Sequence, residues 1–430
     1  MSRRLMSVVV LLGFFAGSAM ADQLGDEKAR AKQILKIVVG DLEKNYYDPT
    51  FHGENLRELQ TKANDMIDSA RSVGQVYTAI FGLVDRLNDS HTMFLPPGRT
   101  QFPQFGFEAK AYGDKVFVTK IKKKGGARAA GLQVGDQILQ VNGFEAERGS
   151  FDKMMLFFHV LEPVSELELL VVRGNEPPRK IVTTATVKKG MRVFDTENDL
   201  NIWDLITDAE SDEEESDKSS FLKAEENSGI GYFHLRAFDM EPETASSWAT
   251  LMGNAKGVIV DLRGNFGGRV DTLVAFANKF TTEPAVMGDL IGRKKTEPIK
   301  LKPARGAYSV PMVILVDSQS ASAAEMFARH FQRVKRAIVI GDKTSGAVVA
   351  SKTFSEQLGA ERVVPFAIQI STSKIMFPDN ENLEAKGVQP DQMCVPTGEE
   401  LRSNRDLCYT VAMHTLAKQL GINLPPPKAE

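Results

Sequence analysis

The stretch VILVDSQSASAAEMFARH, residues 313–330, decides the predicted fold class. It opens with an apolar run typical of a buried strand, passes through a turn of small polar residues, and continues with the apolar spacing of a helix. The same alternation recurs from Gly229 onward. Strand-like runs cover 229–235, 257–262 and 311–316, and helix-like runs cover 241–252, 269–280 and 322–334. Strands that alternate with helices predict an α/β layer domain.

Two further regions precede this α/β part. Between Asp26 and Arg86 apolar residues recur three and four positions apart, which predicts a small helical domain. Runs such as KVFVTKI (115–121) and ELELLVV (166–172) predict strands of a β-domain. We therefore expect a helical domain over 22–100, a β-domain over 101–190 and an α/β domain over 191–430.

The first 21 residues have the pattern of an export signal. Arg3 and Arg4 precede an apolar stretch from Leu5 to Phe15, and Ala19-Met20-Ala21 follows as a cleavage site. The apolar stretch is too short to cross about 30 Å of hydrocarbon. We expect cleavage after Ala21, no stable membrane span, and a mature protein in the periplasm or outside the cell.

Composition is that of a globular protein, with 42% hydrophobic and 25% charged residues. Cleavage after Ala21 leaves 51 basic and 56 acidic residues, a formal charge of −5, so nucleic acid is not an expected partner. Seven of the ten residues at 208–217 are acidic, which predicts a solvated loop. Cys394 and Cys408 are expected to form a disulfide in an oxidising compartment; two buried free thiols are the alternative.

Three serines, Ser318, Ser320 and Ser322, lie in the turn between the strand and the helix of residues 313–330. A helix N-terminus favours a developing oxyanion, so a serine there suits nucleophilic attack. Simple helix capping is the alternative, because serine is a common N-cap residue.

A glycine-rich turn, GNFGG at 264–268, follows a second strand. Its glycines allow close approach of the backbone, so its amides could donate to an oxyanion. A phosphate site is the competing interpretation, but neither known glycine-rich phosphate motif is present.

The run ARAAGLQVGDQILQVNG, residues 127–143, closely resembles the core of a PDZ domain, and FPQFGFEAK (102–110) stands where the carboxylate-binding loop of that family lies. The resemblance implies that amides around Gly106 and Phe107 bind the terminal carboxylate of a peptide. The peptide would then add a strand to the sheet. A β-domain that serves only as a spacer is the alternative.

Five motifs follow in order: GYFHLRAF (231–238), DLRGNFGG (261–268), SQSASAAE (318–325), GDKTSG (341–346) and EAKGVQPD (384–391). Behind a PDZ domain, this set resembles the C-terminal processing peptidases, also called tail-specific proteases, and their tricorn-like relatives. The resemblance covers most of the mature chain. It implies a crotonase-like (ClpP/crotonase-type) α/β core with an inserted PDZ domain, and serine endopeptidase activity without a cofactor.

The resemblance also implies roles for single residues. The nucleophile of the family stands three positions before the glutamate of its S-A-S-A-x-E run, which here is Ser322. The implied oxyanion donors are the amides of Ala323 and of Gly267 or Gly268. The lysine base of the processing peptidases is replaced by Ala347, and neither Lys343 nor Lys352 stands in its place.

The tricorn-like branch implies a different base. It uses a histidine that follows a serine, with a glutamate that orients the imidazole; here these are His91, Ser90 and Glu384. A neutral histidine can accept the serine proton near neutral pH. Glu381 is the rival for Glu384, and Ser320 is a lesser rival for the nucleophile. A structural role for His91 and a lysine base both stay open.

The leading hypothesis is an exported serine endopeptidase that binds C-terminal or unfolded polypeptide segments. The alternative is an inactive binding or scaffold protein of the same fold that has lost the lysine. No metal site is expected, because the sequence has no H-E-x-x-H motif and no clustered cysteine and histidine set. The sequence does not determine whether the chain forms a homo-oligomer.

Overall fold

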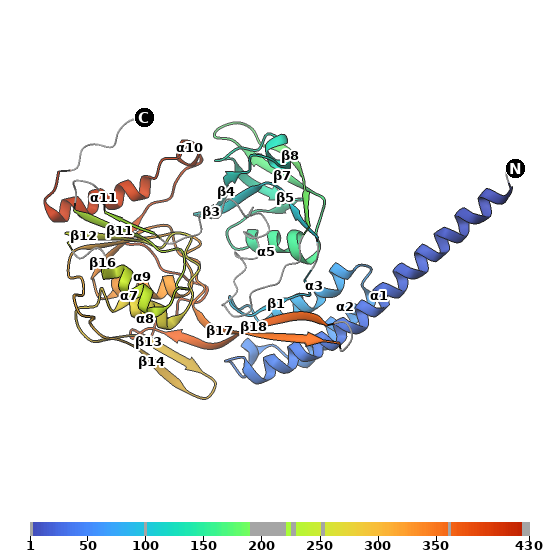
Figure 1. The fold of residues 1–430 in the computed structure, drawn as a ribbon, viewed down its shortest axis with the longest axis horizontal. Helices are drawn as coiled ribbons and strands as arrows, with labels where there is room; N and C mark the ends of the chain where they lie inside the picture. Colours follow the sequence, from blue (N-terminus) through green and yellow to red (C-terminus); the bar gives the residue numbers. More distant parts are fainter. Residues whose placement is uncertain are drawn as a thin grey trace.

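The computed structural model describes residues 3–98, 101–189, 221–224, 229–250, 254–359 and 363–423. The acidic run at 208–217 lies outside these residues. Figure 1 shows a helical part in blue, a β-domain in teal and green, and an α/β part in yellow to red. The expected mixed α/β architecture is confirmed at this level.

Three helices form the N-terminal part: α1 (Arg3–Asn45), α2 (Leu56–Ser69) and α3 (Val73–Asp85). The Asn55 and Ser72 side chains cap α2 and α3 by accepting hydrogen bonds from first-turn amides, as polar N-cap residues do. The predicted helical region is therefore confirmed. Within the described residues, no helix has the length and apolar character needed to span a membrane.

The β-domain is built on a sheet with the order β3-β4-β5-β7-β8, in which β6 pairs with β5. Its strands are β3 (Phe107–Tyr112), β4 (Lys115–Ile121), β5 (Gln137–Val141), β6 (Phe144–Glu145), β7 (Glu166–Val172) and β8 (Arg179–Thr184). Helices α4 (Gly126–Ala129) and α5 (Phe151–Leu156) accompany the sheet. The runs that predicted β4 and β7 match those strands residue for residue. At the entry and exit of the domain, β2 (Gln101–Gln104) pairs with β9 (Thr186–Lys189).

The α/β part contains a six-stranded sheet with the order β10-β11-β12-β15-β16-β19. Its strands are β10 (Phe221–Ala224), β11 (Ile230–His234), β12 (Gly257–Asp261), β15 (Met312–Val316), β16 (Ala337–Gly341) and β19 (Gln392–Met393). All neighbouring pairs are parallel except β10 with β11. Parallel strands need crossover helices, which explains the strand–helix alternation seen in the sequence.

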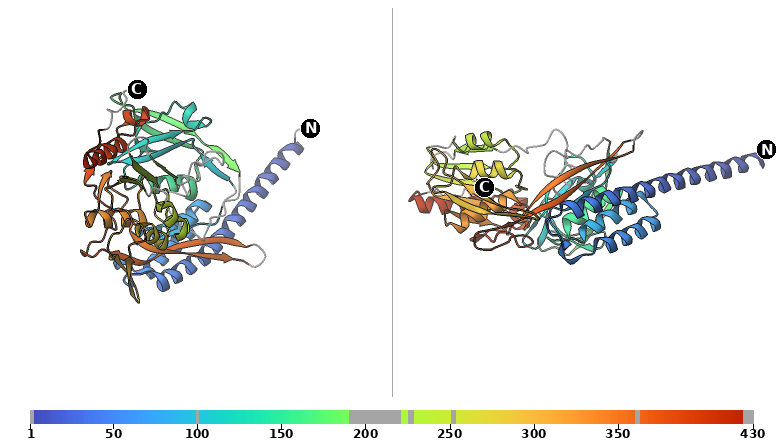
Figure 2. Two further views of the ribbon diagram at one scale, coloured as in Figure 1. Left: turned by 60° about the vertical axis from the view of Figure 1, so that its left-hand side comes forward. Right: turned by 90° about the horizontal axis from the view of Figure 1, so that it is seen from below.

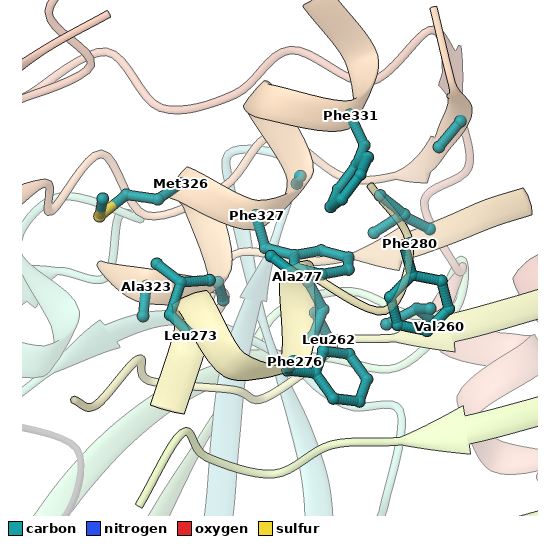
Figure 3. Packing of buried hydrophobic residues seen from close by; sticks show 14 of the residues in the cluster. Val260, Leu262, Leu273, Phe276, Ala277, Phe280, Ala323, Met326, Phe327 and Phe331 are labelled. Carbon is teal, nitrogen blue, oxygen red and sulfur yellow. The ribbon is translucent and has the colours of Figure 1, made fainter. Parts of the chain in front are cut away.

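Helices cover both faces of this sheet, so its central strands β12 and β15 are buried on both sides. Side chains of β15 alternate between the two cores: Ile314 packs with one cluster and Val313 with the other. On one face, α8 (Val270–Ala277) and α9 (Ala323–Arg333) meet through aromatic rings. Figure 3 shows Phe276 and Phe280 of this layer beside Phe327 and Phe331. The described residues of the α/β part also form helices α7 (Pro242–Thr250), α10 (Gly398–Arg402) and α11 (Leu407–Leu420).

A second sheet joins the helical part to the α/β part. It has the order β1-β18-β13-β14, and β17 also pairs with β18. Its strands are β1 (Met93–Leu95), β13 (Ala285–Gly292), β14 (Thr296–Leu301), β17 (Val349–Leu358) and β18 (Val364–Met376). Phe366, Ile368 and Ile370 of β18 are buried in the core of the three helices. Figure 2 shows the β17–β18 hairpin in orange, lying along those helices.

Cys394 and Cys408 form the predicted disulfide. Both side chains are buried with α11 against the six-stranded sheet. The bridge closes a 14-residue separation, so the chain-entropy model gives a stabilisation of about 3 kcal/mol.

Candidate active site

Ser322 lies at the N-cap of α9, directly after the turn that follows β15. Its backbone has φ 52° and ψ −116°, a conformation that non-glycine residues rarely adopt. The other two serines of the turn are already engaged. Ser320 Oγ donates to Leu262 O at 2.7 Å, and Ser318 Oγ donates to Ala111 O. Ser322 is itself the N-cap and forms a capping box with Glu325, so the expected helix-capping role is present. Of the three serines it is also the one with a strained backbone, a feature that clusters at active sites.

The glycine turn lies against Ser322. A Cβ placed on Gly267 would come within 2.6 Å of Ser322 Cβ and 3.1 Å of the Ala323 amide nitrogen. The amide of Gly267 donates to Asn265 Oδ1 at 2.8 Å. Among the described residues, the amides of Ala323 and Gly268 have no acceptor. An N–H in the first turn of a helix has no partner within the helix, so Ala323 is a natural donor to an external oxyanion.

Glu325, fully buried in the first turn of α9, ties Ser322 to the loop of residues 344–347. Its carboxylate accepts from Thr344 Oγ1 at 2.5 Å, from the amides of Gly346 and Ala347 at 2.8 and 2.9 Å, and from the Ser322 amide at 3.2 Å. Burial raises the pKa of Glu325 to about 7, although all four donors favour the charged form. From the sequence, Glu325 could be recognised only as part of the S-A-S-A-x-E motif, and no role could be given to it.

Ala347, which the resemblance places where the processing peptidases have their lysine, lies beside Ser322. Its carbonyl accepts from the Ser322 amide at 2.8 Å. Lys352 is exposed on β17, and the carbonyl of Lys343 accepts from Arg148. Neither lysine lines the cavity next to Ala347.

Ser90 and His91 belong to the segment between α3 and β1. Ser90 Oγ lies 2.8 Å from His91 Nδ1. Asp89 Oδ1 accepts from the His91 amide at 3.0 Å and from Ser371 Oγ of β18 at 2.5 Å, which fixes the segment to the second sheet. Burial lowers the pKa of His91, while the Asp89 charge raises it to a smaller extent. The neutral imidazole is thus favoured near neutral pH.

Glu384 contacts Ser90 rather than the imidazole. Its Oε1 accepts from the Ser90 amide at 3.0 Å, and its Oε2 accepts from the Val348 amide at 2.7 Å. Burial raises the pKa of Glu384, whereas hydrogen bonding from Ser90 lowers it. The rival Glu381 instead pairs with Arg329 at 2.5 Å. Ser90 therefore stands between Glu384 and His91.

A cavity of about 290 Å³ brings these groups together. It lies where the helical part, α5 of the β-domain and the loops around Ser322 meet. Its lining includes Ser90, His91, Arg148, Asp152, Phe266, Ala321, Ser345, Gly346, Ala347, Gln369 and Glu384. Ala321 and Ala347, the neighbours of Ser322, thus share one cavity with His91.

The β-domain contacts the loops of this site directly. Lys110 of β3 forms a buried ion pair with Asp317. Arg148 donates to Asp342 at 3.1 Å and to the carbonyl oxygens of Thr344, at 3.1 Å, and Lys343. These contacts, which the sequence did not indicate, connect the β-domain to the loop that Glu325 orders.

The predicted peptide-binding loop lies at the start of β3. Gly106 has φ 84°, and its carbonyl accepts from the Lys122 amide at 3.0 Å. Phe107 is buried, and β3 pairs only with β4 in the described part of that sheet. An edge strand can accept an added strand, which agrees with the predicted mode of peptide binding without testing it.

Comparison with known proteins shows which families the chain is similar to. Residues 229–393 match the model of peptidase family S41, and residues 99–171 match the PDZ domain model. The α/β part is thus similar to the family S41 peptidases, and a region similar to PDZ domains precedes it. The predicted combination is confirmed. Probable CtpA-like serine proteases from Staphylococcus aureus and Staphylococcus epidermidis are 26% and 24% identical to this chain over 327 and 355 residues, covering 73% and 78% of it.

The chain spans 58% and 65% of the length of those two relatives. Mature CPAF complexed with lactacystin has a similar structure, with a TM-score of 0.67, 14% identity, and coverage of 92% of this chain and 98% of that chain. The photosystem II D1 C-terminal processing protease follows, with a TM-score of 0.50, 18% identity, and coverage of 86% and 94%. At these identities the likeness shows that the S41 domain and its surroundings share a fold with both proteins.

Proposed function

We propose that the chain is an exported serine endopeptidase whose nucleophile is Ser322 and whose base is His91. The observation that carries the proposal is the chain of contacts from Glu384 through Ser90 to the imidazole, beside a cavity that also borders Ala321 and Ala347, the neighbours of Ser322. Ala347 stands at the position of the lysine and cannot accept a proton, so the nucleophile needs another base, which the segment after the helical part supplies. The family match and the names of the relatives lend no support to an inactive binding protein.

In the proposed reaction, Ser322 Oγ attacks the carbonyl carbon of the peptide bond while its proton passes to His91 Nε2. Nδ1 of that tautomer carries a proton and donates to Ser90 Oγ, which couples the imidazolium to the Glu384 carboxylate. The amides of Ala323 and Gly268 stabilise the oxyanion; Gly267 serves the turn. His91 then protonates the leaving amine, and water hydrolyses the acyl-enzyme in a second cycle.

For substrates, we propose unfolded or C-terminal polypeptide segments. The PDZ domain would bind the terminal carboxylate at the Gly106–Phe107 loop and align the peptide along β3. The division at residues 22–100, 101–190 and 191–430, the crotonase-like class of the core, and export with cleavage after Ala21 are parts of the same proposal. The parallel sheet flanked by helices supports the crotonase-like class.

The test is digestion of an unfolded protein, such as reduced casein, by the mature chain. Wild type is expected to cut it, and Ser322→Ala to leave it intact while keeping the same melting temperature. A substrate with a peptide tail that ends in a free carboxylate should be cleaved faster than the same substrate with an amidated tail. Cleavage that persists in Ser322→Ala would show that another group is the nucleophile.

A further inference from the structure

Four acidic residues line the cavity beside His91, and three of them form hydrogen bonds or ion pairs within the protein. Asp85 pairs with Lys153 at 2.5 Å. Asp89 accepts from two backbone amides, from the Tyr46 hydroxyl and from the Ser371 hydroxyl. Glu384 accepts from two backbone amides. These three carboxylates have their hydrogen bonds within the protein.

Asp152 is the exception. It lies in the first turn of α5 and is partly buried. Its carboxyl group forms no hydrogen bond or ion pair with any other residue in the described part of the chain. Arg148, whose charge lowers the pKa of Asp152, is already engaged by Asp342 and by the carbonyl oxygens of Lys343 and Thr344. Burial outweighs that charge and raises the pKa of Asp152 well above its usual range.

The Asp152 carboxyl group therefore has a positive charge nearby, on Arg148, but no ion pair or hydrogen bond with it. Desolvation of an acid without a compensating partner costs free energy, and an incoming cation with hydrogen-bond donors would remove that cost. The cavity wall is partly apolar, with Phe81, Val84 and Met93 among its lining residues. Lysine and arginine have an apolar stem and a cationic head, so they match both features.

The size of the cavity indicates a small ligand such as a single amino-acid side chain. Its volume of about 290 Å³ lies at the lower limit of the ~300–1,000 Å³ that small-molecule pockets occupy. Because Ala321 and Ala347 on its wall flank the nucleophile turn, a side chain held there belongs to a residue close to the scissile bond.

We propose that Asp152 binds the cationic side chain of a lysine or arginine next to the scissile bond, and so sets a preference for basic residues. This inference rests on the proposed peptidase function. Asp152 is then a specificity residue, supplied by the PDZ domain to a site whose nucleophile belongs to the S41 domain. Hydrolysis itself does not need it.

The experiment maps the cleavage sites of the mature protein in reduced casein by mass spectrometry and then measures kcat/KM on two peptides. The peptides share one mapped site and differ by arginine or norleucine at the residue beside the cut. Wild type is expected to prefer the arginine peptide at least about tenfold, which corresponds to about 1.4 kcal/mol. Asp152→Asn should lose this preference and keep its rate on the norleucine peptide. Asp152→Glu should retain most of the preference.

Asp114→Asn is the matched control, because it removes the same charge from an exposed turn of the same domain. It should keep the preference of wild type. Two results would overturn the role of Asp152 and leave the proposed peptidase function standing. One is cleavage of casein by wild type without enrichment of basic residues at the sites. The other is an arginine preference that survives in Asp152→Asn. If wild type cuts neither casein nor either peptide, the proposed function itself is wrong and this inference with it.

Discussion

Ser90 has the most informative side chain at the scale of single residues. Its hydroxyl oxygen lies within hydrogen-bond distance of His91 Nδ1, and its backbone amide donates to Glu384. Through these two contacts, the position of the Glu384 carboxylate helps to orient the imidazole. In related catalytic arrangements, removal of the orienting group costs up to about 10⁴-fold in kcat.

We expect Ser90→Ala to lower kcat roughly 10²-fold with little change in KM, because the imidazole remains but its tautomer is no longer fixed. Steady-state hydrolysis of a casein-derived peptide measures both parameters. Ser345→Ala is the control, since Ser345 lines the same cavity and makes no hydrogen bond to His91. Unchanged kcat in Ser90→Ala would remove Ser90 from the catalytic set.

The pH profile distinguishes two buried groups. A base must be neutral, so activity should be lost as His91 becomes protonated. Because burial lowers the pKa of His91 from 6.5, the acid limb of kcat/KM is expected below pH 6.5, with full activity at pH 7. A limb centred near pH 7 that moves in Glu325→Gln would instead assign control to Glu325, whose pKa is raised to about 7.

At the scale of elements, the turn of residues 264–268 and the start of α9 form one unit. Gly267 has φ 104° and leaves no space for a side chain beside Ser322. We expect Gly267→Ala to lower kcat at least about 10²-fold, since the new methyl group would displace the nucleophile, and misplacement of about 1 Å can cost that much.

The control for this prediction is Gly306→Ala. Gly306 also has a positive φ, 71°, but has open space around it, so this variant isolates the backbone strain. Melting temperature and kcat are measured for both variants. Equal kcat values in the two would show that the glycine turn does not support the nucleophile.

Elements differ in how well the sequence predicted them. The strands and helices around residues 313–330 were predictable, because parallel strands buried on both faces appear as continuous apolar runs. The second sheet was not: β1 and β18 are far apart in sequence, and their pairing depends on tertiary contact. For the same reason, Ser90 and His91 could be named only by resemblance, while the roles of Asp89 and Glu325 emerged from the contacts of the folded chain.

At the scale of the whole molecule, the site is assembled from three parts of the chain. His91 lies in the segment after α3, which Asp89 and β1 fix to β18. The β-domain contacts the loops of the proposed site through Lys110 and Arg148, and Ser322 belongs to the α/β part. Buried ion pairs are costly to break when one partner is removed, so these contacts fix how the parts are arranged.

We expect Arg148→Ala to reduce the activity of the intact protein about tenfold or more, because the carbonyls of Lys343 and Thr344 lose the Arg148 donor and Asp342 loses one of its donors. Arg128→Ala is the control, since its side chain donates to the Lys122 carbonyl within the PDZ domain. Hydrolysis rates and melting temperatures of both variants give the comparison. Equal rates would mean that the PDZ contact does not order the loop.

The most direct test of the account is the reaction of the mature protein with a fluorophosphonate probe, followed by mapping of the label by mass spectrometry. The account predicts a label on Ser322 in wild type, no label in Ser322→Ala, a label strongly reduced in His91→Ala, and a label retained in Lys343→Ala. A label on another serine, full labelling of His91→Ala, or loss of labelling in Lys343→Ala would contradict the assignment of nucleophile and base.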